Sequence, residues 1–384
     1  MAIRPTQPAD PPLAREADPS LSTAEPIVAP LRRIERGRGA TIDPGNRYRR
    51  DQREWADDGW TREDDPLPPR QTIVTIQQSR TIIARNDSPD IAFNQSINPY
   101  QGCEHGCIYC FARPTHAYHD LSPGLDFETR LLAKPNAAAL LEAELARPGY
   151  ACEPIALGTN TDPYQPIERD WKITRSILEV LAACEHPFTI VTKSALVERD
   201  LDIIAPMAAK NMARVFLSIT TLDKSLARTL EPRAAAPHRR LQAIETLAKA
   251  GVPTGVMVAP VIPQLNDKDM EAILEAAAKA GASSAGWVIL RLPLEVAPLF
   301  RDWLTTHYPL RAAHVMSVVR QIHGGRDYDA TWGKRQRGSG VYSDLIARRF
   351  DLACKRYGLK GDREPLDTSR FKPPRKASAQ FDLF

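Results

Sequence analysis

Three cysteines stand close together in the segment NPYQGCEHGCIYCFAR, where Cys103, Cys107 and Cys110 have the spacing C-x3-C-x2-C. Three thiolates on one short loop can each bind a different iron atom of a cubane iron–sulfur cluster. The fourth iron then has no protein ligand, which leaves a coordination position open to a substrate or a cofactor. Gly102 and Gly106 allow the loop to turn tightly, because glycine adopts backbone angles that other residues avoid.

Zinc is the alternative metal for the same loop. Structural zinc usually has four ligands in two separated pairs, and no second cysteine pair follows this loop. His105 or His116 could, however, provide a fourth ligand. The remaining cysteines, Cys152, Cys184 and Cys354, stand singly in or beside apolar segments, where a thiol is usually a small buried side chain. The cysteine spacing by itself therefore allows either zinc or an iron–sulfur cluster.

Strand-like and helix-like segments alternate after the cysteine loop. Short apolar runs such as EPIALGT, FTIVTK, ARVFLSITT and GVMVAPVI are each followed by a segment with apolar residues at helical spacing. Repeated βα units predict an α/β fold with a parallel sheet and helices outside it. With a first strand near residues 91–98, about six strands are expected, which form a partial (β/α)6 TIM-like barrel rather than the full eight. The cysteine loop follows the first strand and is therefore expected at the C-terminal ends of the strands.

The composition divides the chain into three parts. Residues 1–70 are rich in Pro, Arg and Asp with few large apolar side chains, which predicts a mostly disordered segment. Residues 71–308 are expected to form the barrel core, with an N-terminal β extension at TIVTIQQSRTIIARN. Residues 309–384 are expected to form a C-terminal helical extension, in which a basic, glycine-rich loop joins two helices.

The overall composition is that of an ordinary globular protein, with 43% hydrophobic residues and a net charge of +4. This charge does not by itself indicate a nucleic-acid-binding protein. No apolar stretch reaches the roughly 20 residues that span a bilayer, and the first residues lack the apolar centre of a secretory signal. We therefore expect no membrane association and a cytoplasmic location, where cysteines stay reduced.

The longer motif NPYQGCEHGCIYCFARPTH, which opens the βα series, resembles the radical S-adenosylmethionine (SAM) superfamily over about residues 90–305. It is similar to a bacterial branch related to spore photoproduct lyase, often labelled "DNA repair photolyase". The resemblance implies that Cys103, Cys107 and Cys110 bind a [4Fe-4S] cluster whose fourth iron chelates SAM. It implies that an electron from the cluster cleaves SAM to methionine and a 5′-deoxyadenosyl radical, which abstracts hydrogen from the substrate. It also implies an electron donor such as a flavodoxin or ferredoxin.

Four further residues are assigned to cofactor binding by the same resemblance. Tyr109 precedes the third cysteine, where its ring can shield the cluster or stack on a base. Thr161 lies in the stretch TNTD after the second strand, where polar groups face the SAM amino group; the alternative for this stretch is an Asx-turn that caps the next helix. Lys193 closes the third strand, where a lysine contacts the SAM carboxylate, and Ser218 ends the fourth strand near the ribose. A solvated lysine and a simple strand hydroxyl are the alternatives for these two residues.

One departure from the spore lyase pattern concerns the reaction itself. That pattern has a hydrogen-donating cysteine in the stretch that corresponds to TNTD, whereas this chain has Thr159 there. A threonine is a far poorer hydrogen-atom donor than a thiol. We therefore expect radical chemistry of this superfamily on an unidentified substrate, without the lyase's own reaction.

The basic loop near the C-terminus makes a nucleic acid one candidate substrate. Basic residues could grip phosphates and aromatic residues could stack on bases, and the alternative is a solvated surface loop. The residues concerned are Arg320, Arg326, Lys334, Arg335, Arg337, Trp332 and Tyr342. Two rival functions stay open: a nucleic-acid-binding protein with a structural zinc or non-catalytic iron–sulfur site, and an enzyme that acts on a peptide.

Overall fold

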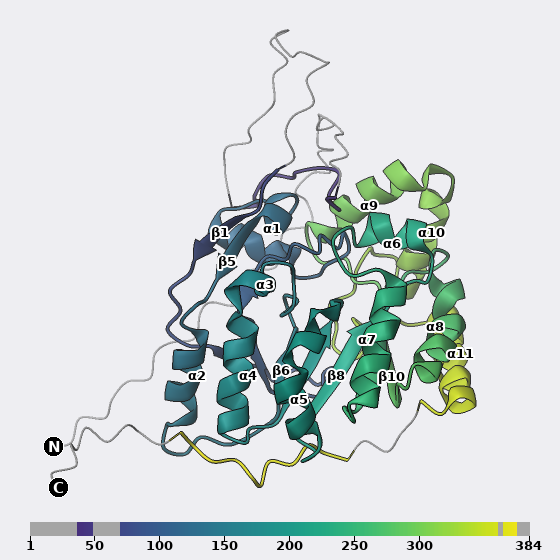
Figure 1. Ribbon diagram of the computed structural model, residues 1–384. Helices are drawn as coiled ribbons and strands as arrows, with labels where there is room; N and C mark the ends of the chain where they lie inside the picture. The colour runs from purple at the N-terminus through teal and green to yellow at the C-terminus, as the bar shows by residue number, and fades with distance from the viewer. Residues whose placement is uncertain (1–36, 49–69, 360–363, 375–384) are drawn as a thin grey trace, which may run out of the picture.

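A computed structural model describes residues 37–48, 70–359 and 364–374 of the chain (Figure 1). Its main sheet consists of β2 (Ile83–Arg85), β3 (Gln95–Ile97), β6 (Ile155–Leu157), β7 (Phe188–Thr192), β8 (Ala213–Ser218), β9 (Thr254–Val261) and β10 (Ser284–Ile289). The strand order is β10-β9-β8-β7-β6-β3-β2. Every neighbouring pair from β3 to β10 is parallel, and only β2 is antiparallel to its neighbour β3. The six parallel strands confirm the predicted α/β partial barrel.

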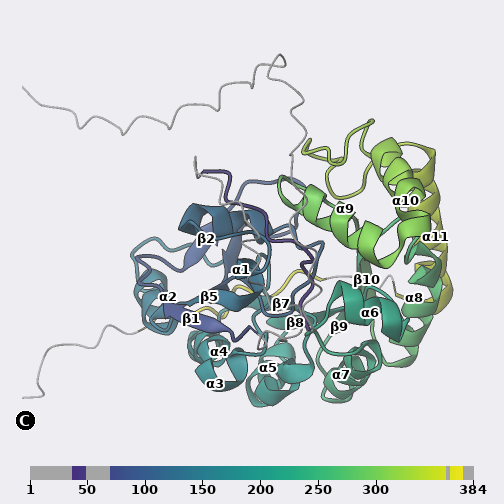
Figure 2. The ribbon, with the colours of Figure 1, turned by 90° about the horizontal axis from the view of Figure 1, so that it is seen from above.

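Helices follow the parallel strands in turn and lie in an arc outside them when the molecule is seen from above (Figure 2). They are α2 (Ala137–Leu145), α4 (Ile173–Ala183), α5 (Leu201–Ala208), α7 (Pro237–Lys249), α8 (Met270–Lys279) and α9 (Val296–His307). Short helices in the connecting loops are α1 (Asp126–Thr129), α3 (Glu168–Trp171) and α6 (Lys224–Leu230). The segment before α5, Ala195–Asp200, forms a 3-10 helix.

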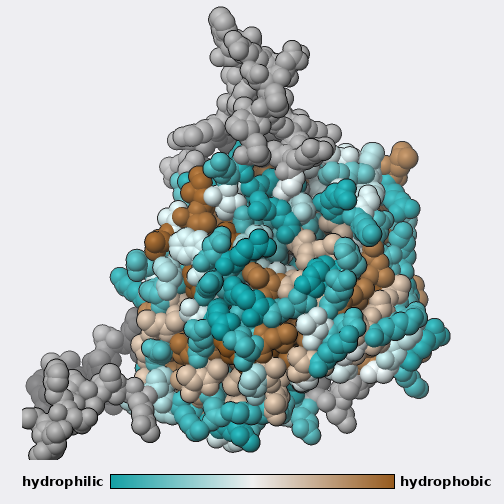
Figure 3. All heavy atoms as spheres, in the orientation of Figure 1, coloured by the Kyte–Doolittle hydropathy of each residue, from teal (hydrophilic) through white to brown (hydrophobic). Residues whose placement is uncertain are grey.

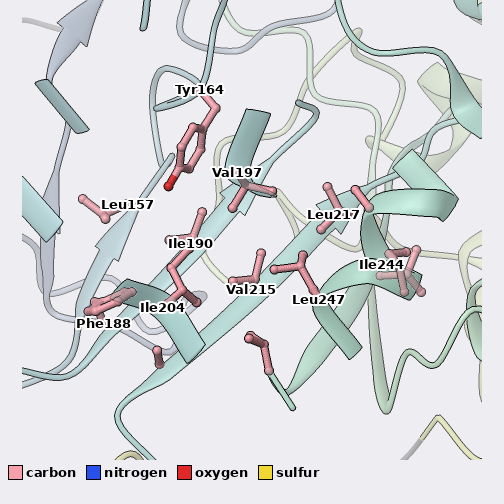
Figure 4. Close-up of a cluster of buried hydrophobic side chains, with 14 of the residues drawn as sticks. Leu157, Tyr164, Phe188, Ile190, Val197, Ile204, Val215, Leu217, Ile244 and Leu247 are labelled. Carbon is pink, nitrogen blue, oxygen red and sulfur yellow. The ribbon is translucent and has the colours of Figure 1, made fainter. Parts of the chain in front are cut away.

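The core between the sheet and the outer helices is built from alternate residues of the strands. Ile190 on β7 and Val215 on β8 point toward Ile204 of α5, and Leu217 on β8 points toward Ile244 of α7 (Figure 4). All five side chains are fully buried. Each buried aliphatic side chain of this size stabilises the fold by about 1.5–3 kcal/mol. Burial on both sides of the sheet explains why these strands read as near-continuous apolar runs.

A second, three-stranded sheet encloses the cysteine loop. It consists of β1 (Ile73–Ile76), β5 (Arg130–Ala133) and β4 (Tyr100–Gln101), in the order β1-β5-β4. β4 directly precedes Cys103 and β5 follows α1, so the antiparallel pairing of β4 with β5 fixes both ends of the segment between them. β1 and β2 lie in the segment where the sequence predicts an N-terminal β extension, and they belong to two different sheets.

Residues 37–48 differ from the prediction of a disordered N-terminal segment, because they pack against the folded core. Ala40 is buried, and the hydroxyl of Thr41 donates to the Asp302 carboxylate of α9 at 2.5 Å. The side-chain amide of Asn46 donates to the carbonyl oxygen of Ala117 at 3.0 Å. Polar contacts and small side chains hold this stretch, and neither gives a hydrophobic pattern in the sequence. The rest of the predicted segment, residues 1–36 and 49–69, lies outside the described residues.

The C-terminal part contains α10 (Pro309–Ile322), a loop and α11 (Val341–Tyr357), which is the helix–loop–helix order that the sequence predicts. The loop reaches both edges of the main sheet. The backbone of Ile289 in β10 donates to the Gln336 carbonyl at 2.9 Å, and Arg335 forms an ion pair with Asp90, which precedes β3. The loop therefore covers the seam that a six-stranded partial barrel leaves open. In the described ranges, none of the helices is long and apolar enough to cross a bilayer.

Candidate active site

The cysteine loop lies at the C-terminal edge of the main sheet, where the sequence predicts it. Cys103 and Cys107 are buried, Cys110 is half-buried, and all three are free thiols. The backbone N–H of Cys103 donates to the carbonyl of Phe127 at 2.9 Å. Gly106 has a φ of 65°, in the left-handed region that favours glycine. The three thiols are therefore carried by one tightly turned loop whose backbone is anchored to a neighbouring element.

A buried ion pair holds the backbone of this loop. The guanidinium of Arg113 lies 2.5 Å from the carboxylate of Glu128, and both side chains are fully buried. Arg113 also donates to the carbonyl oxygens of Gly106 at 3.2 Å and Cys107 at 3.0 Å. The second carboxylate oxygen of Glu128, Oε2, accepts a hydrogen bond from the backbone N–H of Gly39 at 2.9 Å. The loop is thus fixed through its backbone, which leaves the thiols available for ligation.

His105 and Asp162 connect the cysteine loop to the loop that follows β6. Nδ1 of His105 lies 3.3 Å from the Asp162 carboxylate, which also accepts from the hydroxyl of Thr192 at 2.6 Å and from the backbone of Lys193 at 2.7 Å. Burial opposes ionisation of Asp162, but His105 and these donors outweigh it and lower its pKa to about 2. Asp162 also accepts from the backbone N–H of Tyr164 at 2.9 Å, which is the Asx-turn that the sequence left as an alternative.

Tyr109 lies in a buried polar network at the ends of β8 and α6. Its hydroxyl donates to the carboxylate of Glu231, which also accepts from Thr220 and is paired with Arg240. Burial opposes ionisation of Glu231, but Arg240 and Lys193 outweigh it and lower its pKa to about 2. A buried carboxylate therefore remains charged beside the cysteine loop and fixes the Tyr109 ring by its hydroxyl.

Lys193 and Ser218 reach the same region from β7 and β8. Nζ of Lys193 lies 5.8 Å from the centre of the Tyr109 ring. Burial opposes the charge of Lys193, but Cys107 and Glu231 outweigh it and raise its pKa. Ser218 is buried, and its carbonyl oxygen accepts from Arg240 at 2.9 Å. The structure therefore brings Tyr109, Lys193 and Ser218 together around Cys107, Glu231 and Arg240.

Thr161 lies on the same edge of the sheet but its hydroxyl has a local partner. The hydroxyl donates to the carbonyl oxygen of Tyr100 at 3.0 Å, and the backbone N–H approaches Oδ1 of Asn98 at 3.3 Å. The same Oδ1 accepts from the backbone of Asn160 at 2.9 Å. Asn98 therefore organises the stretch after β6 from the end of β3.

The cysteine-loop region has relatives among known proteins. The model of the radical SAM superfamily matches residues 97–277, from β3 to α8. The chain is 37% identical over 300 residues to an uncharacterized protein of Mycobacterium tuberculosis, an alignment that covers 76% of this chain and 84% of the relative. The chain belongs to the radical SAM superfamily. An uncharacterized protein of Methanocaldococcus jannaschii is 29% identical over 171 residues, which cover 44% of this chain and 61% of the relative.

Two solved structures of radical SAM proteins are also similar to the chain. Spore photoproduct lyase complexed with dinucleoside spore photoproduct is 18% identical, with a TM-score of 0.46 over 74% of this chain and 78% of that one. Streptococcus suis SuiB bound to S-adenosylmethionine is 13% identical, with a TM-score of 0.41 over 68% of this chain and 46% of that one. Membership of the radical SAM superfamily implies an iron–sulfur cluster and SAM as cofactors.

The cysteine loop of this radical SAM chain offers three free thiols as metal ligands. Burial raises the pKa of Cys107 to about 12, so a metal must displace thiol protons when it binds. In the described part of the chain, no three His, Cys, Asp or Glu side chains stand close enough to hold one ion. His105 is bonded to Asp162, and Nε2 of His116 lies 2.9 Å from the carbonyl of Arg130.

Several residues of the predicted basic loop have partners within the molecule. Arg335 pairs with Asp90, the Arg337 guanidinium lies 4.3 Å from the Trp287 ring, and the Tyr342 hydroxyl donates to Asp267. Arg320 pairs with Asp327 at 2.8 Å. Arg326, Trp332 and Lys334 remain exposed. Arg335 and Arg337 therefore attach the loop to the core, whereas Arg320 pairs within the C-terminal part of the chain.

Sequence reasoning missed the buried carboxylates that support the site. Glu128 lies in an unremarkable polar segment, and Glu231 lies among arginines in LEPRAAAPHRR. Both are almost fully buried and paired with an equally buried arginine, Arg113 and Arg240 respectively. An Arg three residues after the last cysteine was a usable signal, because a buried loop needs donors for its carbonyl groups.

Proposed function

We propose that the chain is a radical SAM enzyme that binds a [4Fe-4S] cluster through Cys103, Cys107 and Cys110. The observation that carries the proposal is the single loop with three free thiols at the C-terminal edge of the parallel sheet. The bound cluster and SAM would supply a 5′-deoxyadenosyl radical, formed by reductive cleavage of SAM, that abstracts hydrogen from an unidentified substrate. The protein holds, orients and shields these groups.

The side chains around Cys107 have the chemistry that SAM binding requires. Lys193 provides a positive charge for the SAM carboxylate, and Glu231 keeps a negative charge beside Tyr109. Ser218 lies at the end of β8, within reach of the Arg240 network, and is our candidate for the ribose contact. Thr161 is our candidate on the side of β6, where its local hydrogen bond positions the backbone of the TNTD stretch.

For the substrate and the electron donor, the proposal names only the class of molecule. A nucleic acid is the candidate substrate, supported by the exposed Trp332 and Lys334 on the C-terminal loop. An acidic redox protein such as a flavodoxin or ferredoxin is the candidate electron donor. The proposal includes a cytoplasmic location, where thiols that bind a cluster stay reduced.

The test of cluster binding is anaerobic reconstitution with iron and sulfide. We expect a brown protein with about four iron atoms and four sulfides per chain. The triple variant Cys103→Ala, Cys107→Ala, Cys110→Ala should bind none. The matched control is the triple variant Cys152→Ala, Cys184→Ala, Cys354→Ala, which removes the same number of thiols and should bind the full complement. Zinc at one atom per chain without sulfide would favour the rival nucleic-acid-binding protein with a structural metal.

The test of catalysis uses the reconstituted protein, dithionite and SAM. Formation of 5′-deoxyadenosine by the native chain, but not by the three-cysteine variant, is the expected result. Reconstituted and reduced protein that never yields 5′-deoxyadenosine would refute the enzymatic proposal. Filter binding of single-stranded DNA and RNA at stated salt, with Trp332→Ala as the variant, tests the candidate substrate class.

A further inference from the structure

Arg291 lies just after β10, where the C-terminal loop meets the cysteine loop. Its guanidinium is 4.6 Å from the centre of the Phe111 ring, and Nη2 donates to the Tyr328 hydroxyl at 3.3 Å. Phe111 directly follows Cys110, which is the least buried of the three thiols. Cys110 and Tyr328 also pack against the same apolar cluster. Arg291 therefore places a positive charge beside the Cys110 side of the cysteine loop.

The charge of Arg291 has no counter-ion within the described parts of the chain, although the side chain is half-buried. Asp90 lies near it, but the Asp90 carboxylate is bound by Arg335 and by the backbone N–H of Gly333 at 2.6 Å. Burying a charge without a partner opposes folding, because the charge loses its hydration and gains nothing in return. An anion that bound at Arg291 would remove this cost.

A second polar group of the same side chain also lacks a partner. Nε of Arg291 is buried, and no atom of the described residues accepts a hydrogen bond from it. Buried donors without an acceptor are rare in folded proteins, so each one calls for an explanation. An oxygen atom of a bound ligand would satisfy Nε and neutralise the charge of Arg291 together.

The neighbours of Arg291 hold it in place without using its charge. Leu290 and Leu292, on either side of it in the chain, are buried in one apolar cluster. Nε2 of the buried His323 donates to the carbonyl oxygen of Leu290 at 3.0 Å, and the His323 ring meets Tyr328 edge-on with 5.9 Å between the ring centres. Both the backbone before Arg291 and the ring beside it are therefore fixed before any ligand arrives.

Surface hydropathy gives no comparable signal on the face shown in Figure 3. Hydrophilic side chains predominate there over α3 and the upper ends of α5 and α7, as on an ordinary solvated surface. Charges on such a surface are hydrated and screened by salt. A half-buried cation without a partner is more informative, because the fold keeps it in spite of its cost.

We propose that Arg291 is a substrate-binding residue that holds a phosphate group of the substrate beside Cys110. The inference rests on the proposed function, because it assumes that the substrate is brought to a cofactor bound at the three cysteines. Nε–H and the terminal N–H groups of a guanidinium form a planar fork that binds two phosphate oxygens at once. The rings of Phe111 and Tyr328 flank this fork and keep it oriented.

The number of donors favours a phosphate over a carboxylate. The Tyr328 oxygen accepts from Nη2 of Arg291, so the hydroxyl proton of Tyr328 is a further donor next to the guanidinium fork. A phosphate group has enough oxygens to accept from the fork and from the hydroxyl together, whereas a carboxylate has only two oxygens. A phosphate therefore matches the donors at this position better.

The test measures binding of three probes to the reconstituted full-length protein by calorimetry. The probes are deoxycytidine, deoxycytidine 5′-monophosphate, which carries a phosphate monoester, and the dinucleoside phosphate of deoxycytidine, which carries a diester. At least one phosphate probe should bind the native chain about tenfold or more tightly than deoxycytidine. Tighter binding of the monoester would assign a terminal phosphate to Arg291, and tighter binding of the diester would assign an internal one.

Two substitutions of Arg291 separate its charge from its shape. Arg291→Met, which keeps the apolar stem, should weaken binding of the phosphate probes about tenfold or more and leave deoxycytidine binding unchanged. Arg291→Lys keeps the charge without the planar fork and should show an intermediate loss. The matched control Arg348→Met, at an exposed arginine on α11, should bind all three probes as the native chain does.

Thermal unfolding distinguishes a substrate-binding role from a structural one. Arg291→Met should have a Tm no lower than that of the native chain, because it removes a charge that has no partner. Inorganic phosphate should raise the Tm of the native chain and of Arg348→Met, but not that of Arg291→Met. A clearly lower Tm for Arg291→Met would show that Arg291 holds the C-terminal loop in place and would overturn the proposal.

The remaining outcomes separate this proposal from the proposed function. Equal affinity of the native chain for deoxycytidine and both phosphates would overturn the phosphate site, and so would unchanged phosphate binding by Arg291→Met. Glutarate that displaces the phosphate probes as well as inorganic phosphate does would show that the site does not select phosphate. Dithionite-driven formation of 5′-deoxyadenosine by the native chain and Arg348→Met needs no nucleotide. If neither forms this product, the proposed function fails while the binding result still stands.

Discussion

The guanidinium of Arg113 donates from Nε to the carbonyl oxygen of Cys107 at 3.0 Å, inside a fully buried ion pair with Glu128. This contact places a fixed charge pair beneath the backbone that joins the second and third cysteines. The loop is therefore held through its backbone, and none of the three thiols takes part in this contact. Glu128 in turn binds the backbone of residues 39 and 40, which joins the N-terminal stretch to the same support.

Arg113→Met should destabilise the protein strongly. Removal of one partner leaves the Glu128 charge buried without its cation, which typically costs about 3–5 kcal/mol. Urea unfolding of the apoprotein measures this loss. Lys249→Met, which breaks an exposed pair with Glu245 on α7, is the matched control and should cost less than about 1 kcal/mol. Equal losses in the two variants would show that the Arg113 pair has no special structural role.

Gly106→Ala should prevent formation of the native cysteine loop. Gly106 has a φ of 65°, and an added Cβ would lie 2.7 Å from Oε2 of the buried Glu128. Gly149→Ala is the matched control, because Gly149 has a φ of 78° but open space around its Cβ position. Both changes cost about 1–2 kcal/mol of backbone strain, and only Gly106→Ala adds a clash. Iron and sulfide content after reconstitution should fall for Gly106→Ala and stay at the native value for Gly149→Ala.

Protonation of His186 should lower the free energy of unfolding in mild acid. Burial lowers the pKa of His186 to about 4, below the value of about 6.5 in an unfolded chain. The unfolded state therefore binds a proton first, so stability is lost as pH falls from about 6.5 toward 4. The difference between the two His186 pKa values corresponds to a loss of about 3 kcal/mol in the free energy of unfolding across this window. Unfolding free energies at a series of pH values should show a smaller slope for His186→Gln than for the native chain.

The exposed His238 provides the control for this pH dependence. His238→Gln should keep the native slope between pH 6.5 and 4. A His186→Gln variant with an unchanged slope would mean that other groups cause the acid sensitivity. His186 lies just before the N-terminal end of β7, at the opposite edge of the sheet from the cysteine loop, and its ring is bonded to Tyr150 and Pro187, so the measurement does not depend on cluster content.

Asp90→Ala should release the C-terminal loop from the edge of the sheet. Asp90 accepts from the backbone of Gly333 at 2.6 Å and pairs with Arg335. Without these contacts, trypsin should cut after Lys334 and Arg335 severalfold faster, because proteolysis requires local opening of the loop. Asp87→Ala, at an exposed acid on the same connection, is the control. Unaltered cleavage in Asp90→Ala would show that the loop is held by other contacts.

Elements that depend on local patterns could be predicted from the amino-acid sequence. The spacing of Cys103, Cys107 and Cys110 placed the thiols on one loop, and the alternation of apolar runs with helical periodicity predicted six βα units. These features could be predicted because thiol spacing and side-chain periodicity are properties of short segments. Because the cysteine loop follows the first strand and the strands are parallel, its position at the C-terminal edge of the sheet could also be predicted.

The folded structure was needed to show which buried charges support the site and which segments close it. Glu128 contacts Gly39 across 89 positions of sequence, and Arg335 reaches Asp90 across 245. In the basic loop, which in sequence resembles a free phosphate-binding surface, Arg335 and Arg337 are bound to the core for the same reason. A buried charge needs an oppositely charged partner, because burying it unpaired is costly, and the fold brings that partner near from a distant part of the chain. Such pairs leave no periodic signal in the sequence.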